Sequence, residues 1–156
     1  MPNIVHRIST DAATPDEMFD AVSTREGFIS WWTEQVNGSE SLNEVLEFRF
    51  GEDAGGFDFQ VMELERPTKV TFLCVDGPKE WIGTDVEFRI SQEDNHTVLF
   101  FAHRGWREEV PFMHHCSTQW GDFLLSLKEK FETGIGRPFG PNFRPIDNWS
   151  PLVPVS

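Results

Sequence analysis

The chain contains no tyrosine and only two cysteines, and its basic side chains are half as numerous as its acidic ones. Among 156 residues, 26 are Asp or Glu and 13 are Lys or Arg, which gives a formal net charge of −13. Such a charge repels phosphate backbones and anionic lipid surfaces, so we expect no nucleic-acid binding and no electrostatic docking to membranes. The absence of tyrosine removes a common acid and oxyanion donor of enzymes that act on enols or phenols.

Long apolar runs are also missing. No run approaches the roughly 18 residues that a membrane-spanning helix needs, and residues 1–7 lack the basic and then apolar pattern of a secretory signal. The two cysteines, Cys74 and Cys116, form no close-spaced metal or redox motif. We therefore expect a cytoplasmic protein without membrane insertion, and two free, buried thiols rather than a disulfide.

What the sequence has instead is 15 phenylalanines and six tryptophans. The longest regular pattern covers residues 111–134 and has the period of a helix, with Pro111 suited to its first turn and Gly134 to its end. Its apolar side chains fall within an arc of about 120°: Phe112, Met113, Cys116, Trp120, Phe123, Leu124, Leu127 and Phe131. A stripe this wide predicts a large apolar partner surface.

The rest of this helix projects away from that arc. We expect the following residues to lie outside it, with Leu125 as the apolar exception: His114, His115, Thr118, Gln119, Asp122, Ser126 and Glu129. Both histidines are therefore predicted to be solvated. The run from His114 to Cys116 does not suit a metal, because consecutive helical residues diverge by about 100°. Gly121 is expected to face solvent or to mark a close backbone approach, and Trp120 to point into the core.

Alternation of apolar and polar residues predicts the strands. They are expected at residues 4–9, 45–50, 57–61, 70–74, 84–90 and 97–104. Thr14 and Glu17 form a capping box that begins a short helix, and a second short helix begins at Thr24. Successive hairpins indicate an antiparallel sheet, and the segregation of strands from helices indicates an α+β domain with the long helix across the concave face of the sheet.

Several short motifs together are similar to those of one known family. They are Trp31-Trp32-Thr33, Cys74-Val75-Asp76-Gly77-Pro78, Trp81-Ile82-Gly83-Thr84, His103-Arg104-Gly105-Trp106, the helix containing His115-Cys116, Trp120 and Phe123-Leu124, and Gly134-Ile135-Gly136-Arg137-Pro138. In combination they resemble the bacterial homologues of the heat-shock-protein ATPase activator, within the START and birch-pollen-allergen-like superfamily (SRPBCC). The resemblance covers most of residues 4–138.

This resemblance implies a helix-grip fold, in which a curved antiparallel sheet wraps around the long C-terminal helix and two short helices follow the first strand. It also implies a hydrophobic cavity between sheet and helix. We expect a single domain over residues 1–137 and a Pro-rich tail over residues 138–156 that is extended or poorly ordered. Superfamily members bind lipids, hormones or polyketides, a few catalyse cyclisation and some assist chaperones, so the fold alone does not fix the function.

The leading functional hypothesis is non-enzymatic binding of a small hydrophobic molecule between sheet and helix. Trp32, Trp81, Trp106 and Trp120 could each fill a core or line a cavity, since indole gives a broad contact area and one N–H donor. The candidate ligand-binding residues are Trp32, Phe48, Phe59, Phe72, Cys74, Trp81, Phe88, Phe101, His103, Trp106, Met113, Cys116 and Trp120. We assign no catalytic residue, no metal and no cofactor.

Two alternatives remain open. His103 shares a strand face with Leu99 and Phe101, and it is a structural histidine, a donor that orients a ligand, or the acid–base residue of a cyclase or dehydratase. The second alternative is a protein-partner module that acts on a chaperone, because an acidic surface steers a basic partner. The identity of the ligand and the oligomeric state are left open by the sequence.

Overall fold

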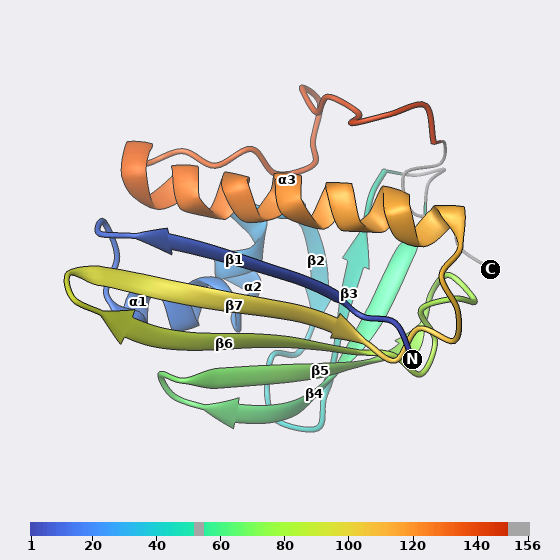
Figure 1. The fold of residues 1–156 in the computed structure, drawn as a ribbon, viewed down its shortest axis with the longest axis horizontal. Coiled ribbons are helices and arrows are strands. Elements are labelled where there is room, and N and C mark those ends of the chain that lie inside the picture. The colour runs from blue at the N-terminus through green and yellow to red at the C-terminus, as the bar shows by residue number, and fades with distance from the viewer. Residues whose placement is uncertain (52–54, 150–156) are drawn as a thin grey trace.

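The structure, a computed structural model, describes residues 1–51 and 55–149. Within these ranges the strands are β1 (Ile4–Thr10), β2 (Gln35–Gly38), β3 (Val45–Arg49), β4 (Gly56–Glu65), β5 (Lys69–Asp76), β6 (Asp85–Glu93) and β7 (His96–Arg104). The helices are α1 (Pro15–Ala21), α2 (Arg25–Ile29) and α3 (Pro111–Thr133). The predicted α+β, helix-grip architecture is confirmed: Figure 1 shows α3 lying along one face of a curved sheet.

All neighbouring strands in the sheet are antiparallel, in the order β1-β7-β6-β5-β4-β3-β2. The first strand pairs with the last, from Ile4 opposite His103 to Thr10 opposite Thr97. The strand β2 was not predicted. It is four residues long and only Val36 in it is buried, so it carries too little alternation to be read from the sequence.

Local side chains begin the two short helices as predicted. The Thr14 hydroxyl accepts a hydrogen bond from the Glu17 N–H at 3.1 Å, and the Glu17 carboxylate accepts one from the Thr14 N–H at 2.8 Å. Thr24 caps α2 by accepting from the Gly27 N–H at 2.9 Å. A side chain at position 27 would meet the carbonyl oxygen of Asp20, so glycine there permits α1 and α2 to pack closely.

Aromatic rings fill most of the space between sheet and α3. Trp32 lies at its centre, with ring centroids 4.6 Å from Phe48 and 4.9 Å from Trp120. The apolar stripe of α3 is buried as predicted, apart from the half-buried Phe131, and Leu125 is exposed. Gly121 is half-buried and would tolerate a Cβ, so it marks no close backbone approach.

The described part of the tail turns back along α3 (Figure 1). We call residues 136–149 the strap. Phe139 and Thr33 form an isolated parallel β-bridge. The Phe139 N–H donates to the Trp32 carbonyl at 2.8 Å, and the Phe139 carbonyl accepts from the Glu34 N–H at 3.2 Å. The strap contains no helix and no strand, and its Phe139, Phe143 and Trp149 pack on the hydrophobic core. Its continuation over residues 150–156 lies outside the described residues.

Candidate functional site

A line of polar residues runs along α3 beside the apolar stripe. We call His115, Gln119, Asp122, Ser126 and Glu129 the polar line; they follow one another at spacings of four and three residues, so they share one side of the helix. His115, Gln119 and Ser126 are buried, whereas the sequence pattern placed all three outside the buried arc. The prediction that His115 is solvated is therefore wrong, because the strap covers this side of α3.

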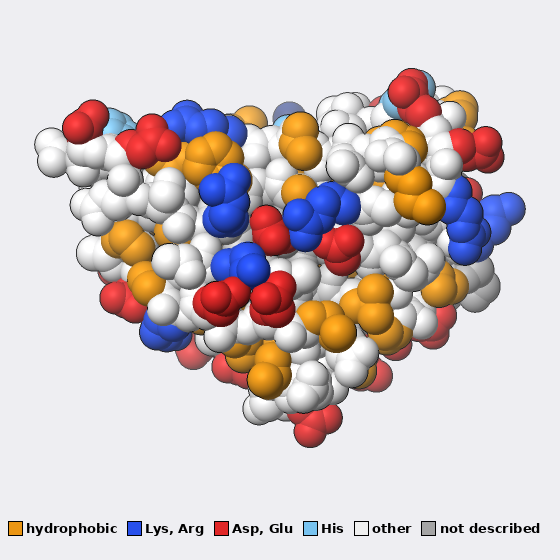
Figure 2. All heavy atoms as spheres, turned by 60° about the horizontal axis from the view of Figure 1, so that its bottom comes forward, with side chains coloured by type: hydrophobic (Ala, Val, Ile, Leu, Met, Phe, Trp, Pro, Cys, Tyr) orange, Lys and Arg blue, Asp and Glu red, His pale blue; other side chains and the backbone are white. Residues whose placement is uncertain are grey.

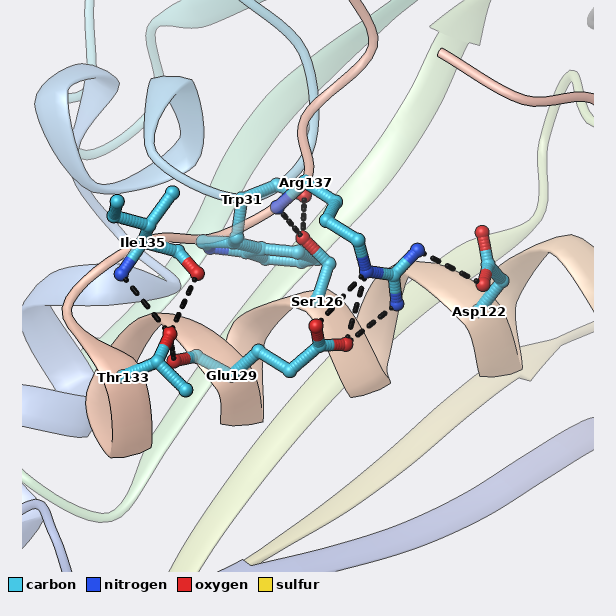
Figure 3. Close-up of polar contacts among 7 residues, drawn as sticks. All are labelled: Trp31, Asp122, Ser126, Glu129, Thr133, Ile135 and Arg137. Atoms are coloured by element: carbon cyan, nitrogen blue, oxygen red, sulfur yellow. Dashed lines mark hydrogen bonds and ion pairs between the residues drawn. The ribbon is translucent and has the colours of Figure 1, made fainter. Parts of the chain in front are cut away.

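Arg137 fastens the first part of the strap (Figure 3). Its guanidinium lies 2.7 Å from Glu129 and 3.3 Å from Asp122. Hydrogen bonding to Arg137 lowers the pKa of Glu129, against a smaller effect of burial. These ion pairs are partly exposed and contribute little. The buried Ser126 gives a firmer contact, because its hydroxyl accepts from the Arg137 N–H at 2.6 Å and donates to the Trp31 carbonyl at 2.9 Å.

His115 and Asp147 fasten the other end of the strap. The His115 Nδ1 lies 2.9 Å from both carboxylate oxygens of Asp147, and the ring of Trp149 stacks on the imidazole with centroids 5.4 Å apart. Hydrogen bonding to His115, and then to the Trp149 N–H, lowers the pKa of Asp147. This end therefore combines a polar anchor with an aromatic cover.

A small cavity of about 20 Å³ lies beside α3, at the first two residues of the polar line, His115 and Gln119. This volume is enough for about one water molecule. Four of the predicted ligand-binding residues line it: Trp32, Trp81, Cys116 and Trp120. Sequence reasoning missed five more: Phe50, Phe57, His115, Gln119 and Phe123.

The strap contacts three residues of the cavity wall. Phe139 packs on Phe50 with ring centroids 5.6 Å apart, and Phe143 packs on Phe123 at 5.8 Å. The third residue is His115, which Asp147 and Trp149 hold as described. The strap therefore supports the wall of the cavity from outside.

Two polar side chains of the cavity wall are left without hydrogen-bond partners among the described residues. Gln119 is 5% exposed, and neither its Oε1 nor its Nε2 has a partner; Trp81 is 3% exposed, and its Nε1 has none. The Trp81 N–H also acts on the Cys116 thiol and lowers its pKa by less than burial raises it, but the two groups do not meet the geometry of a hydrogen bond. Trp106 Nε1 is also unpartnered, but Trp106 does not line the cavity.

The other nine predicted site residues pack in the core and do not line this cavity. They are Phe48, Phe59, Phe72, Cys74, Phe88, Phe101, His103, Trp106 and Met113. Cys74 and Cys116 are both free and buried, as predicted. Burial raises the pKa of the Cys74 thiol to about 12, and the pKa of Cys116 is raised for the same reason. Thiols in this state are poor nucleophiles.

His103 is enclosed by polar and aromatic side chains. The Trp120 Nε1–H donates to its Nδ1 at 3.2 Å, and Thr84 Oγ1 lies 2.8 Å from its Nε2 while donating to the Trp81 carbonyl. This chain of donors assigns a neutral imidazole with its proton on Nε2. Desolvation lowers the pKa of His103 to about 3. With 0% of its surface exposed, His103 has no open space in which to meet a substrate.

Two further properties bear on the kind of site. Among the described residues, no group of three or more His, Cys, Asp or Glu side chains is arranged to hold a metal ion. In the same part of the chain, no helix has the length and apolar character needed to cross a membrane.

Comparison with known proteins gives the family. Residues 12–132 match the family model described as Activator of Hsp90 ATPase homolog 1-like protein. The solution structure of the Aha1 dimer from Colwellia psychrerythraea is 36% identical and superposes with a TM-score of 0.79, covering 87% of this chain and 100% of that one. No curated protein matches the chain.

More distant structures share the fold. SSP2350 from Staphylococcus saprophyticus is 15% identical with a TM-score of 0.72, over 88% of this chain and 97% of that one. CalU16 from Micromonospora echinospora is 21% identical with a TM-score of 0.71, over 92% and 75%. Given the extent of the family match and the identity to the Colwellia protein, this chain belongs to the Activator of Hsp90 ATPase homolog 1-like family of the SRPBCC superfamily.

Proposed function

We propose that the protein binds a small, largely apolar ligand beside α3, in the cavity whose outer wall the strap supports. The observation that carries the proposal is the pair of unpartnered polar side chains, Gln119 and Trp81, in an otherwise aromatic cavity wall. Ligand sites are commonly apolar pockets with a few placed polar groups. Most of the thirteen candidate residues then serve as the packed support of the site rather than as its lining.

The size of the cavity makes the strap part of this function. With the strap in place, the cavity holds about one water molecule. A larger ligand therefore needs the wall residues Phe50, His115 and Phe123 to move outward, and each of them is held by a ring or an anchor of the strap. Release of the strap is the step that admits the ligand.

A fluorescence titration with the neutral hydrophobe N-phenyl-1-naphthylamine tests the proposal. We expect saturable binding to the wild type and tighter binding to Asp147→Ala, whose strap has lost one anchor. Leu125→Ala is the matched control, because Leu125 is exposed on α3. Absence of saturable binding to both the wild type and Asp147→Ala would overturn the proposal.

A second candidate function is association with a protein, either a chaperone or another copy of the chain. The family description names an ATPase activator homologue, and the Colwellia relative is described as a dimer. The face of the sheet that points away from α3 carries basic and acidic side chains together (Figure 2). Ion pairs on the strands include Arg104–Asp85 and Arg7–Glu93. Exposed apolar residues accompany them, among them Val5 and Val75.

Mass measurement distinguishes this candidate from the first. Light scattering during gel filtration would reveal a dimer, and co-purification from a lysate at one-to-one stoichiometry would reveal a chaperone-like partner. A monomer that elutes with a bound small molecule favours ligand binding instead. Introducing charge at Val5 and Val75 should abolish a dimer formed through this face.

A further inference from the structure

On the basis of the proposed function, we infer that the cavity selects a neutral, planar amide-type group on its ligand, recognised by the Gln119 carboxamide and the Trp81 indole N–H. A carboxamide or a lactam carried on an aromatic body has this chemistry. Family membership leaves the polar part of the ligand open.

The unpartnered atoms define the complementary group. Gln119 presents an acceptor at Oε1 and donors at Nε2, and Trp81 presents one donor at Nε1. A carbonyl oxygen has two lone pairs, so one ligand carbonyl can accept from both residues. An adjacent N–H can donate to the Gln119 Oε1. An amide is the simplest neutral group that carries this acceptor and this donor side by side.

The surroundings of the cavity disfavour a charged ligand. No lysine or arginine is among the described residues that line it, so a carboxylate would be desolvated without a cationic partner. A ligand cation could bond to the Gln119 Oε1, but it would leave the Gln119 Nε2 and Trp81 Nε1 donors unpaired. His115 is the one histidine in the cavity wall, and Asp147 already holds its Nδ1. A neutral hydrogen-bonding group therefore fits best.

Gln119 also differs from the other buried members of the polar line. Ser126 and His115 are both paired with the strap or the core. Gln119 is buried with both amide atoms unpaired, an arrangement that destabilises a fold and that an apolar side chain of similar size would relieve. A polar side chain that lowers stability and lines a cavity is expected where the side chain binds a ligand.

The test uses two probes of equal size, naphthalene-2-carboxamide and 2-isopropylnaphthalene, titrated calorimetrically into the wild type and Gln119→Leu. We expect the ratio of their affinities to shift against the carboxamide by about tenfold or more in Gln119→Leu, equivalent to the loss of about one to two hydrogen bonds. Leu125→Ala should leave the ratio unchanged. Binding of both probes with the same ratio in wild type and Gln119→Leu would overturn amide recognition but leave ligand binding intact.

Failure of both probes to bind the wild type would overturn the proposed function and this inference together. A second measurement does not depend on the variant being folded. In nitrogen-15 spectra of the wild type, the Trp81 Nε1–H resonance should move on addition of naphthalene-2-carboxamide much further than on addition of 2-isopropylnaphthalene. Equal shifts with the two probes would contradict the recognition of the amide.

Discussion

The Nδ1 of His115 lies 2.9 Å from the Asp147 carboxylate, so a ring in the first half of α3 holds a residue 32 positions further along the chain. The side chain of His115 is 2% exposed and that of Asp147 is 39% exposed. The preceding residue, His114, makes a similar contact with Glu109 at 2.8 Å, but these side chains are 64% and 68% exposed. Two neighbouring histidines thus make similar pairs in opposite surroundings.

We expect Asp147→Ala to loosen the strap, because it removes the partner of a buried imidazole. Phe143 lies within the strap and packs on Phe123, so chymotrypsin cleavage after Phe143 reports strap opening. The cleavage rate should rise several-fold in Asp147→Ala. Glu109→Ala is the control, since an exposed pair contributes little. Equal rates in the two variants would mean that His115 and Asp147 do not anchor the strap.

The buried His103 should make stability depend on pH. Its pKa is lowered to about 3 in the folded protein, against about 6.5 when unfolded. Between these values the unfolded chain binds the extra proton. The contribution of His103 to the free energy of unfolding is therefore fully present above about pH 6.5, and it falls with acidification by up to about 1.4 kcal/mol per pH unit. Denaturant unfolding between pH 7 and pH 5 measures this slope.

Proton NMR isolates the contribution of His103 from that of other groups. Its ring resonances should stay constant from pH 8 to pH 5, because the ring remains neutral over this range. Titration of His103 within this range in the folded protein would show that its ring reaches water.

Ser126→Ala should be strongly destabilising for so small a change. The hydroxyl is fully buried and joins the Trp31 carbonyl to the Arg137 N–H, and its loss leaves both groups without this partner. We expect a loss of about 1–3 kcal/mol in the free energy of unfolding. Thr118→Ala, at an exposed position of α3, should change it by less than about 0.5 kcal/mol. Chemical denaturation of both variants makes the comparison.

Trp120→Ala should lower stability by about 3–5 kcal/mol, the usual loss for a buried large aromatic residue. Trp120 is 3% exposed, contacts Trp32 and Phe101, and donates to His103. Thermal melts and N-phenyl-1-naphthylamine titration should be made on the same variant. A large destabilisation in a protein whose wild type binds no probe would favour a filled core over a ligand site.

The helices and strands with a regular apolar pattern were predictable, because the spacing of their apolar residues indicates which side packs on the core. Trp120 and Leu127 repeat at the helical period, and Phe88 and Ile90 at the strand period, and all four are buried. The strand β2 is too short and too polar to give such a signal.

The candidate site was less predictable, because polar residues become buried only through their partners. His115 and Ser126 look solvated on the helix, and only contacts with the strap and the core explain their burial. One signal was available in the sequence. The spacing of the polar line matches one side of a helix, and the Pro-rich tail carries three large aromatic residues, Phe139, Phe143 and Trp149, which are unusual in a solvated tail. Periodicity gives no measure of how much space the core rings leave.

The return of the strap along α3 has a consequence for how the chain acquires its structure during synthesis. The strand β1 cannot pair until β7 has been synthesised. The polar line is covered later still, because residues 136–149 are made after every strand and after α3. Until they leave the ribosome, Ser126 and His115 lack their strap partners. A nascent chain that stops at Gly134 would therefore have a complete sheet and helix, with the polar line of α3 still exposed to water. The last step of folding would be the packing of the strap over this side of the helix.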